Sequence, residues 1–181
     1  MQADDPVLYV VDALNALAIP FMLVGSYSSN LYGIPRGTED ADFVIELAER
    51  PIGPLAALIQ DHFKLDSQLG FETVTGRSRW LFRHRASPFQ VELFLLPDEE
   101  FDRARFNRRC EYEIKGRRVW FQSPEDLIVV KLRWKREKDK LDVCDVIKVS
   151  GNSLDWPYIE MWCRHYGSLE LLEQARAAAK R

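Results

Sequence analysis

Two aspartates, Asp40 and Asp42, open the apolar segment 41–45, and this pair constrains the fold more than any other feature of the chain. Side chains alternate along a strand, so both carboxylates point to the same side of a sheet. Two like charges held so close raise each other's pKa unless a cation lies between them. Mg²⁺ is the simplest such cation, because it takes carboxylate and phosphate oxygens as ligands. An acidic turn with both aspartates in solvent is the alternative interpretation.

The chain before this pair predicts a strand, a tight turn and a short helix. Residues 21–24 form an apolar run of strand length that stops at Gly25-Ser26, where Ser26 can cap a helix. The helix should be short and should end at Gly33. Residues 36–38 read Arg-Gly-Thr and lead into the carboxylate pair.

This order of elements resembles a known family. A strand, a Gly-Ser turn, a short helix, an Arg-x-Thr approach and a carboxylate pair on the next strand are similar to the minimal nucleotidyltransferase family, which has the polymerase-β-like fold. Within that superfamily the stretch looks most like the AbiEii-type stand-alone bacterial proteins. The resemblance implies that Gly25 and Ser26 hold a triphosphate and that Asp40 and Asp42 hold metal ions.

A third carboxylate lies in the strongly apolar segment 89–96, which is predicted to be a strand. Burying an ionised carboxylate without a partner is very costly, so Glu92 should either sit at the wet end of the strand or meet a cation. Nucleotidyltransferases place a third acidic residue, often aspartate, on a strand beside the first two. By that resemblance Glu92 completes the metal site.

A later helix carries a lysine on its apolar side. Ser123 followed by Pro124 predicts the N-cap and first-turn proline of a helix that continues to about residue 137. Lys131 shares a helical face with Leu127, which is unusual for a lysine that is merely solvated. Its stem either snorkels past the core edge or carries the ammonium toward phosphate.

Three aspartates, Asp139, Asp142 and Asp145, recur along one side of the next predicted helix. The segments Ser-Pro-Glu-Asp-Leu-Ile-Val-Val-Lys and Arg-Glu-Lys-Asp-Lys-Leu-Asp-Val again resemble the AbiEii-type transferases, in which a helix lysine and a following aspartate complete the site. Lys131 and Asp142 are the matching positions, and Asp139 and Asp145 are weaker candidates. The basic neighbours that can balance these acids are Lys138, Lys140 and Lys148.

Basic residues gather in three parts of the chain. We interpret them as solvated faces paired with local acids, although a polyphosphate or RNA acceptor would need such a surface. They are Arg77, Arg79, Arg83 and Arg85, then Arg103, Arg105, Arg108, Arg109, Lys115, Arg117 and Arg118, and finally Arg133, Lys135, Arg136, Lys138 and Lys140.

The composition is that of a globular protein. The 181 residues are 46% apolar and 12% aromatic, enough for a real core, and the net charge of −3 argues against a protein coated in nucleic acid. No apolar run could span a bilayer and no signal-like amino terminus is seen, so we expect a soluble cytoplasmic protein without membrane partners. Cys110, Cys144 and Cys163 show neither metal-ligand spacing nor a disulfide pattern.

The predicted fold class is α+β, with a mixed sheet, helices against one face and a helical carboxyl-terminal part. We expect residues 1–122 to form a nucleotidyltransferase core and residues 123–181 to pack on it as helices. The other predicted helices cover residues 6–18, 55–63, 98–109, 154–166 and 169–178, and the other predicted strands cover residues 71–75, 79–84, 110–114 and 119–121.

The predicted activity is transfer of a nucleoside monophosphate from a nucleoside triphosphate to an acceptor hydroxyl. Two Mg²⁺ ions would be held by Asp40, Asp42 and Glu92, with Lys131 near the triphosphate and Asp142 orienting Lys131 or the acceptor. The resemblance allows a tRNA end, a partner protein or a small molecule as acceptor. The alternative is a transferase fold that works only by binding, as an antitoxin-like partner or a nucleotide sensor.

Overall fold

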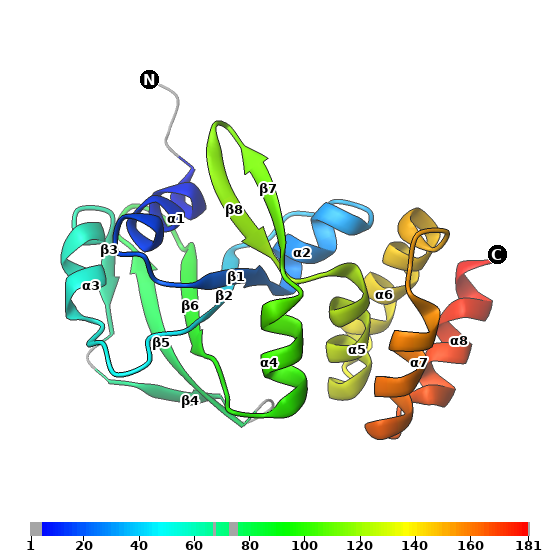
Figure 1. Cartoon of the computed structure of the whole chain (residues 1–181). Coiled ribbons are helices and arrows are strands. Elements are labelled where there is room, and N and C mark those ends of the chain that lie inside the picture. The colour runs from blue at the N-terminus through cyan, green and yellow to red at the C-terminus, as the bar shows by residue number, and fades with distance from the viewer. Residues whose placement is uncertain (1–4, 67, 73–75, 181) are drawn as a thin grey trace.

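The chain forms a mixed β-sheet with a group of helices beside it (Figure 1). The computed structural model describes residues 5–66, 68–72 and 76–180. The strands in this part are β1 (Phe21–Val24), β2 (Asp40–Ile45), β3 (Phe63–Leu65), β4 (Gly70–Glu72), β5 (Arg77–His84), β6 (Gln90–Leu95), β7 (Cys110–Ile114) and β8 (Arg117–Phe121). The helices are α1 (Pro6–Ala16), α2 (Gly25–Tyr32), α3 (Gly53–Ile59), α4 (Glu100–Asn107), α5 (Pro124–Trp134), α6 (Glu137–Ser150), α7 (Trp156–His165) and α8 (Leu169–Ala179).

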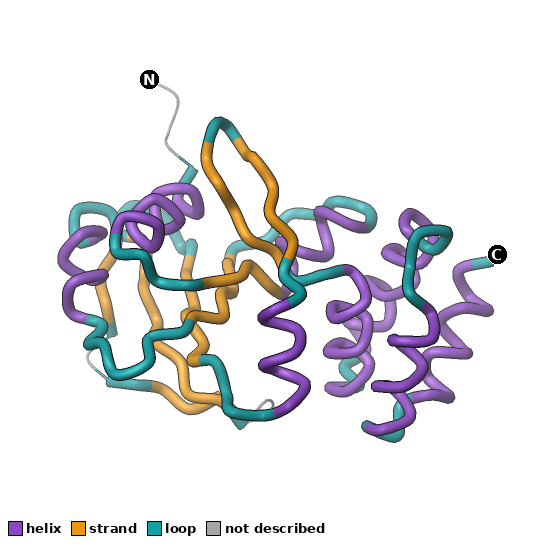
Figure 2. Tube along the Cα trace, viewed as in Figure 1, coloured by secondary structure: helices purple, strands orange, loops and turns teal. Residues whose placement is uncertain are grey.

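The sheet contains both parallel and antiparallel pairs, which confirms the predicted α+β class with a mixed sheet. Its strand order is β3-β5-β6-β2-β1-β8-β7, and β4 pairs with β5. The pairs β2–β6 and β1–β8 are parallel, whereas β1–β2 and β5–β6 are antiparallel. Strands β7 and β8 form a hairpin that projects beyond the sheet (Figure 2), and its turn residues Lys115 and Gly116 both have positive φ, as a tight hairpin requires.

Alternation along the strands separates the two faces of the sheet. Phe43 and Leu93 face a large apolar cluster that includes residues of α1 and α3. Val44 and Phe94, the next residues along, belong to a smaller cluster on the other face with Phe106 of α4. The expectation that helices cover only one face is therefore wrong, because α4 covers part of the second.

The carboxyl-terminal helices share a separate apolar cluster, built mainly from α5, α6, α7 and α8 (Figure 1). Ser123 caps α5 as predicted, since its hydroxyl accepts a hydrogen bond from the Asp126 amide at 3.2 Å. The helix ends at Trp134, earlier than predicted, because Lys135 adopts the left-handed conformation with φ 56°. No helix in the described part of the chain is long and apolar enough to cross a membrane.

Two local predictions are wrong. Ser26 does not cap α2, whose N-cap position is Val24 and has no side-chain hydrogen bond. The helix predicted over residues 55–63 ends at Ile59, and Phe63 begins β3, where its ring is buried in the sheet's larger cluster. Both errors arise because tertiary packing overrides local propensity. Part of the strand predicted over residues 71–75 lies outside the described residues.

A buried ion-pair group joins the sheet to α4. Asp102 is fully buried and contacts Arg105 at 2.8 Å and Arg77 of β5 at 2.7 Å. Arg105 also donates to Gln122 at 3.4 Å. Burial lowers the pKa of Arg105, Asp102 opposes that shift, and the neighbouring charge of Arg77 adds to it. One carboxylate thus holds two buried guanidinium groups.

We expect Asp102→Ala to lower the free energy of unfolding by about 3 kcal/mol or more, because it leaves two buried cations without their shared partner. Chemical denaturation monitored by circular dichroism measures the change. The matched control is Asp98→Ala, which removes an exposed carboxylate that pairs with Arg103 and should change stability little. A similar small effect for both variants would contradict the role assigned to Asp102.

Candidate active site

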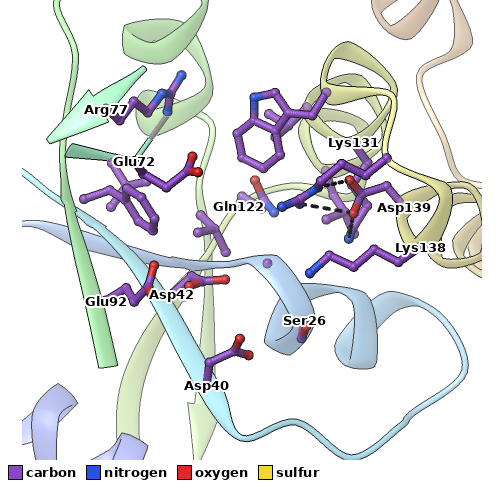
Figure 3. A pocket seen from close by; sticks show the side chains of 18 of the residues that line it. Ser26, Asp40, Asp42, Glu72, Arg77, Glu92, Gln122, Lys131, Lys138 and Asp139 are labelled. Carbon is purple, nitrogen blue, oxygen red and sulfur yellow. Dashed lines mark hydrogen bonds and ion pairs between the residues drawn. The ribbon is translucent and has the colours of Figure 1, made fainter. Parts of the chain in front are cut away.

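A cavity of about 230 Å³ lies between the sheet and helices α5 and α6 (Figure 3). Acidic side chains from the strands form one wall, with Arg77 of β5 on the same side, and Lys131 of α5 and Lys138 of α6 face them. Its charged lining residues are Arg36, Asp40, Asp42, Glu72, Arg77, Arg79, Glu92, Arg105, Lys131, Arg136, Lys138 and Asp139. Gly25 and Ser26 also line it.

Strand pairing brings together the three carboxylates singled out in the sequence. In the parallel pair β2–β6, Asp42 lies directly opposite Glu92, and Asp40 lies opposite Gln90. Because residues paired in register share a face, Asp40, Asp42 and Glu92 all point away from α1 and α3 and into the cavity. About fifty residues of sequence separate the first two from the third, and this register alone closes that gap.

Burial and neighbouring like charges both act on the carboxylate of Asp42. The pKa of Asp42 is raised to about 7, first by burial and then by the nearby charges of Asp40 and Glu92, while Lys138 and Arg136 oppose the shift. Burial also raises the pKa of Glu92, an effect that Arg79 opposes. A cation between these groups would relieve both effects.

Glu92 and Asp40 each have a protein partner. The carboxylate of Glu92 lies 3.3 Å from the guanidinium of Arg79, so the cation that its burial required is an arginine of β5. Asp40 accepts a hydrogen bond from the hydroxyl of Thr38 at 2.5 Å. In the described part of the chain, no three carboxylate, histidine or cysteine side chains are arranged as they stand to hold a metal ion.

The donor set nevertheless fits Mg²⁺. The three charged side chains that line the cavity from β2 and β6 all offer carboxylate oxygens, which are hard ligands that Mg²⁺ prefers. Burial, together with the charges of Asp40 and Glu92, raises the pKa of Asp42, and a bound cation would favour its ionised form. Asp40, Asp42 and Glu92 are therefore the residues that would hold the metal.

Gly25 allows the chain to turn tightly against Asp42. It has φ +62°, a left-handed conformation that is unfavourable for residues with a Cβ. A Cβ built at this position would overlap the carboxylate of Asp42. The hydroxyl of Ser26 accepts a hydrogen bond from Arg36 at 3.3 Å, so this serine faces the cavity and does not cap its own helix.

An ion-pair network forms the basic wall. Lys131 of α5 is buried and donates to Asp142 at 2.7 Å and to Asp139 at 3.0 Å. Arg36, in the loop between α2 and β2, donates to both oxygens of Asp142 at 3.2 Å. Arg136 contacts Asp139 at 2.6 Å. Three cations thus surround two carboxylates, which leaves positive charge on the wall that faces Asp42.

The network shows which contacts the predicted residues of α5 and α6 make. Lys131 lines the cavity, as its proposed role needs, but its ammonium contacts Asp139 and Asp142. Asp142 accepts a hydrogen bond from Lys131 at 2.7 Å, which is the contact that its predicted orienting role needs. Its pKa is lowered even though burial raises it, because the hydrogen bonds from Arg36 and Lys131 outweigh burial. The prediction that Lys138, Lys140 and Lys148 balance these acids is wrong for Asp139 and Asp142. Their ion-pair partners are Arg36, Lys131 and Arg136. Asp145 is not part of this network.

Sequence reasoning did not assign the arginines of the site. Several of the basic residues do pair with local acids at the surface, as in Arg83–Asp66 and Arg118–Glu111. Arg77 and Arg105, in contrast, are buried. The sequence placed Arg77 in the first basic group and Arg105 in the second, and neither pattern indicated that these side chains are buried. Arg36 was part of the Arg-x-Thr approach, but its contact with Asp142 bridges residues far apart in the chain.

The fold is similar to that of nucleotidyltransferase-like proteins with a polymerase-β-like fold. An antigenic nucleotidyltransferase-like protein from Paracoccidioides brasiliensis is similar over 97% of this chain and 91% of its own, with 19% identity and a TM-score of 0.61. The lincosamide antibiotic adenylyltransferase LnuA, solved with lincomycin bound, is similar over 81% and 98%, with 12% identity and a TM-score of 0.56. A putative nucleotidyltransferase from Thermotoga maritima is similar over 73% of this chain and 84% of its own, with 14% identity and a TM-score of 0.53.

At these identities the likeness shows the fold alone. No protein-family model matches the sequence. No curated protein matches it either. The narrower prediction of an AbiEii-type protein therefore stays a prediction, and the activity is inferred below from the site.

We expect Gly25→Ala to disrupt the site, because the new methyl group displaces Asp42 and the left-handed backbone costs about 1–2 kcal/mol. Thermal unfolding should shift downward, and binding of Mg²⁺ with a triphosphate, measured by calorimetry, should weaken. Gly37→Ala is the control, since a Cβ there has no atom within 4 Å. Wild-type triphosphate binding by Gly25→Ala would show that this close approach is not needed.

We expect Asp142→Asn to lower the free energy of unfolding by about 1–3 kcal/mol at pH 7, because Lys131 and Arg36 lose a charged partner. The pKa of Asp142 is lowered in the folded protein, so its contribution is present above the unfolded pKa of about 3.9. It is lost as pH falls through the folded pKa. Denaturation at pH 7 and below pH 4 should therefore show a difference that shrinks on acidification, and Asp145→Asn is the control on the same helix.

Proposed function

We propose that this protein is a magnesium-dependent nucleotidyltransferase that moves a nucleoside monophosphate from a nucleoside triphosphate to an acceptor hydroxyl. The observation that carries the proposal is the register of β2 and β6, which sets Asp42 opposite Glu92 and beside the Gly25-Ser26 turn. The fold shared with nucleotidyltransferase-like proteins supports it. ATP is the first triphosphate to test, because LnuA is an adenylyltransferase.

The reaction forms one bond and breaks one. An oxygen of the acceptor hydroxyl bonds to the α-phosphorus of the triphosphate, and the bond from that phosphorus to the oxygen bridging to the β-phosphate breaks. The hydroxyl proton passes to base or solvent, and pyrophosphate leaves with the electron pair of the broken bond. When bound, two Mg²⁺ ions would supply neutralising charge for the triphosphate and would lower the pKa of the attacking hydroxyl.

The residues of the cavity divide this work. Asp40, Asp42 and Glu92 would hold the metal ions on the acidic wall. The Gly25-Ser26 turn presents backbone N–H groups at the start of α2, where phosphate oxygens are favoured. Lys131 and its network on the opposite wall would offset charge on the triphosphate, while Asp142 positions Lys131.

A second function has its own supporting observation. Glu92 is paired with Arg79 and Asp40 with Thr38, so these two carboxylates are satisfied by protein groups. This arrangement suits a binding module that keeps the fold, such as an antitoxin-like partner in a toxin–antitoxin pair or a nucleotide sensor. In that case the protein would bind a partner protein or a nucleotide and would transfer nothing to an acceptor.

We expect Asp42→Asn to reduce pyrophosphate release from a triphosphate, measured with Mg²⁺ and candidate acceptors, by about a hundredfold or more. The metal loses a central ligand while the side chain keeps its size. The control is Asp66→Asn, which changes a half-exposed carboxylate that pairs with Arg83. Equal release from wild type and Asp42→Asn would favour the binding module, and failure of the wild type to bind any triphosphate with Mg²⁺ would refute the transferase.

A further inference from the structure

Three arginines line one end of the cavity. Arg77 and Arg79 come from β5, and Arg105 comes from α4. Figure 3 shows Arg77 beside Glu72 at the end of the cavity away from Ser26, with Glu92 and Asp42 together on the sheet. Since the Gly25-Ser26 turn and the Lys131 network are the proposed triphosphate site, this other end is the space left for the acceptor.

Two of the three guanidinium groups at this end are held in place by the fold. Arg77 and Arg105 are both buried and share Asp102 as their ion-pair partner, at 2.7 and 2.8 Å. One carboxylate therefore serves two guanidinium groups. Glu72, opposite Arg77 in the β4–β5 pair, adds a negative charge at the margin of the same space.

The charge balance at this end depends on Glu92. Its carboxylate lies 3.3 Å from Arg79, and both side chains are largely covered, at 21% and 26% exposed. If Glu92 holds a metal ion, its charge is directed to that ion and no longer neutralises Arg79. The end lined by the arginines then gains positive charge at the moment when metal and triphosphate are in place.

We propose that this end of the cavity, which we term the arginine subsite (Arg77, Arg79 and Arg105), binds an anionic group of the acceptor. The acceptor is a small hydroxyl compound that carries a phosphate or a carboxylate. Guanidinium groups suit both, because their planar N–H donors match the oxygens of either anion. The inference rests on the transferase function proposed above and names its acceptor class.

Size and charge exclude other acceptor classes from the subsite. The subsite is one end of a cavity of about 230 Å³ whose other end is the proposed triphosphate site, so the group bound there is small. Arg105 is 1% exposed, which places it beyond the reach of a bulky polymer at the surface. An acceptor bearing protonated amines would gain nothing there, because the donors of the three arginines match anions and the nearby carboxylates of Glu92 and Asp102 already have arginine partners.

The test is calorimetry on the full chain saturated with Mg²⁺ and a non-hydrolysable triphosphate analogue. Four probes share a three-carbon frame: glycerol 3-phosphate, glycerate, glycerol and 2-amino-1,3-propanediol. At least one anionic probe should bind about tenfold or more tightly than glycerol, and the amine should bind no better than glycerol. Comparison of the two anionic probes distinguishes a phosphate from a carboxylate acceptor.

Arg77→Gln should weaken the anionic probe about tenfold or more and leave glycerol and the triphosphate analogue unchanged. Folding should survive, because Asp102 keeps its contact with Arg105, and thermal unfolding checks this. Should that variant fail to fold, Arg79→Gln tests the same subsite at a partly exposed position. Arg83→Gln is the matched control, since this arginine is on the same strand but exposed and paired with Asp66.

Three outcomes overturn the proposal. The first is that anionic probes bind no tighter than glycerol although the triphosphate binds. The second is that the arginine variants bind the anionic probe like wild type. The third is that only a phosphate-terminated oligonucleotide binds, which makes the acceptor a nucleic acid. If the triphosphate analogue itself fails to bind the wild type, the transferase function falls and the arginine subsite falls with it.

Discussion

The clustering of like charges on one face of the sheet is the constraint on which the rest of this structure depends. The β2–β6 register sets Asp42 opposite Glu92, and burial together with its neighbours raises the pKa of Asp42 to about 7. Such a group is tolerated only where positive charge can reach it. The Lys131 network, the arginines of β5 and the tight turn at Gly25 all face this one cluster.

Ion pairs also connect the two parts of the molecule. Arg36, from the loop before β2, holds Asp142 of α6, which in turn holds Lys131 of α5. Breaking such buried pairs is costly, although their net contribution to stability is small compared with apolar packing. Their value here is geometric, because they fix the basic wall of the cavity relative to the acidic one. A site between two walls requires that both keep their separation during the reaction.

Local patterns predicted much of the fold. Apolar runs identified the central strands, the Ser123-Pro124 start identified α5, and the hairpin at Gly116 followed from its flanking strands. Predictions failed where packing decided the outcome. Ser26 reads as a helix cap, yet its hydroxyl is used by Arg36. Phe63 reads as the end of a helix, yet its ring fills the core from a strand. In both cases a contact distant in sequence outweighed a preference worth a fraction of a kcal/mol.

The sequence by itself determined which groups are available to the site: two aspartates two residues apart, a glutamate in an apolar strand, and a lysine on an apolar helix face. Alternation also determined that Asp40 and Asp42 share a side. Only the tertiary structure decided which charges meet, that Arg79 pairs with Glu92 and that Arg77 and Arg105 share Asp102. The physical reason is that side-chain periodicity is a local property of the backbone, whereas the partner of a buried charge is set by strand register and helix packing between distant segments.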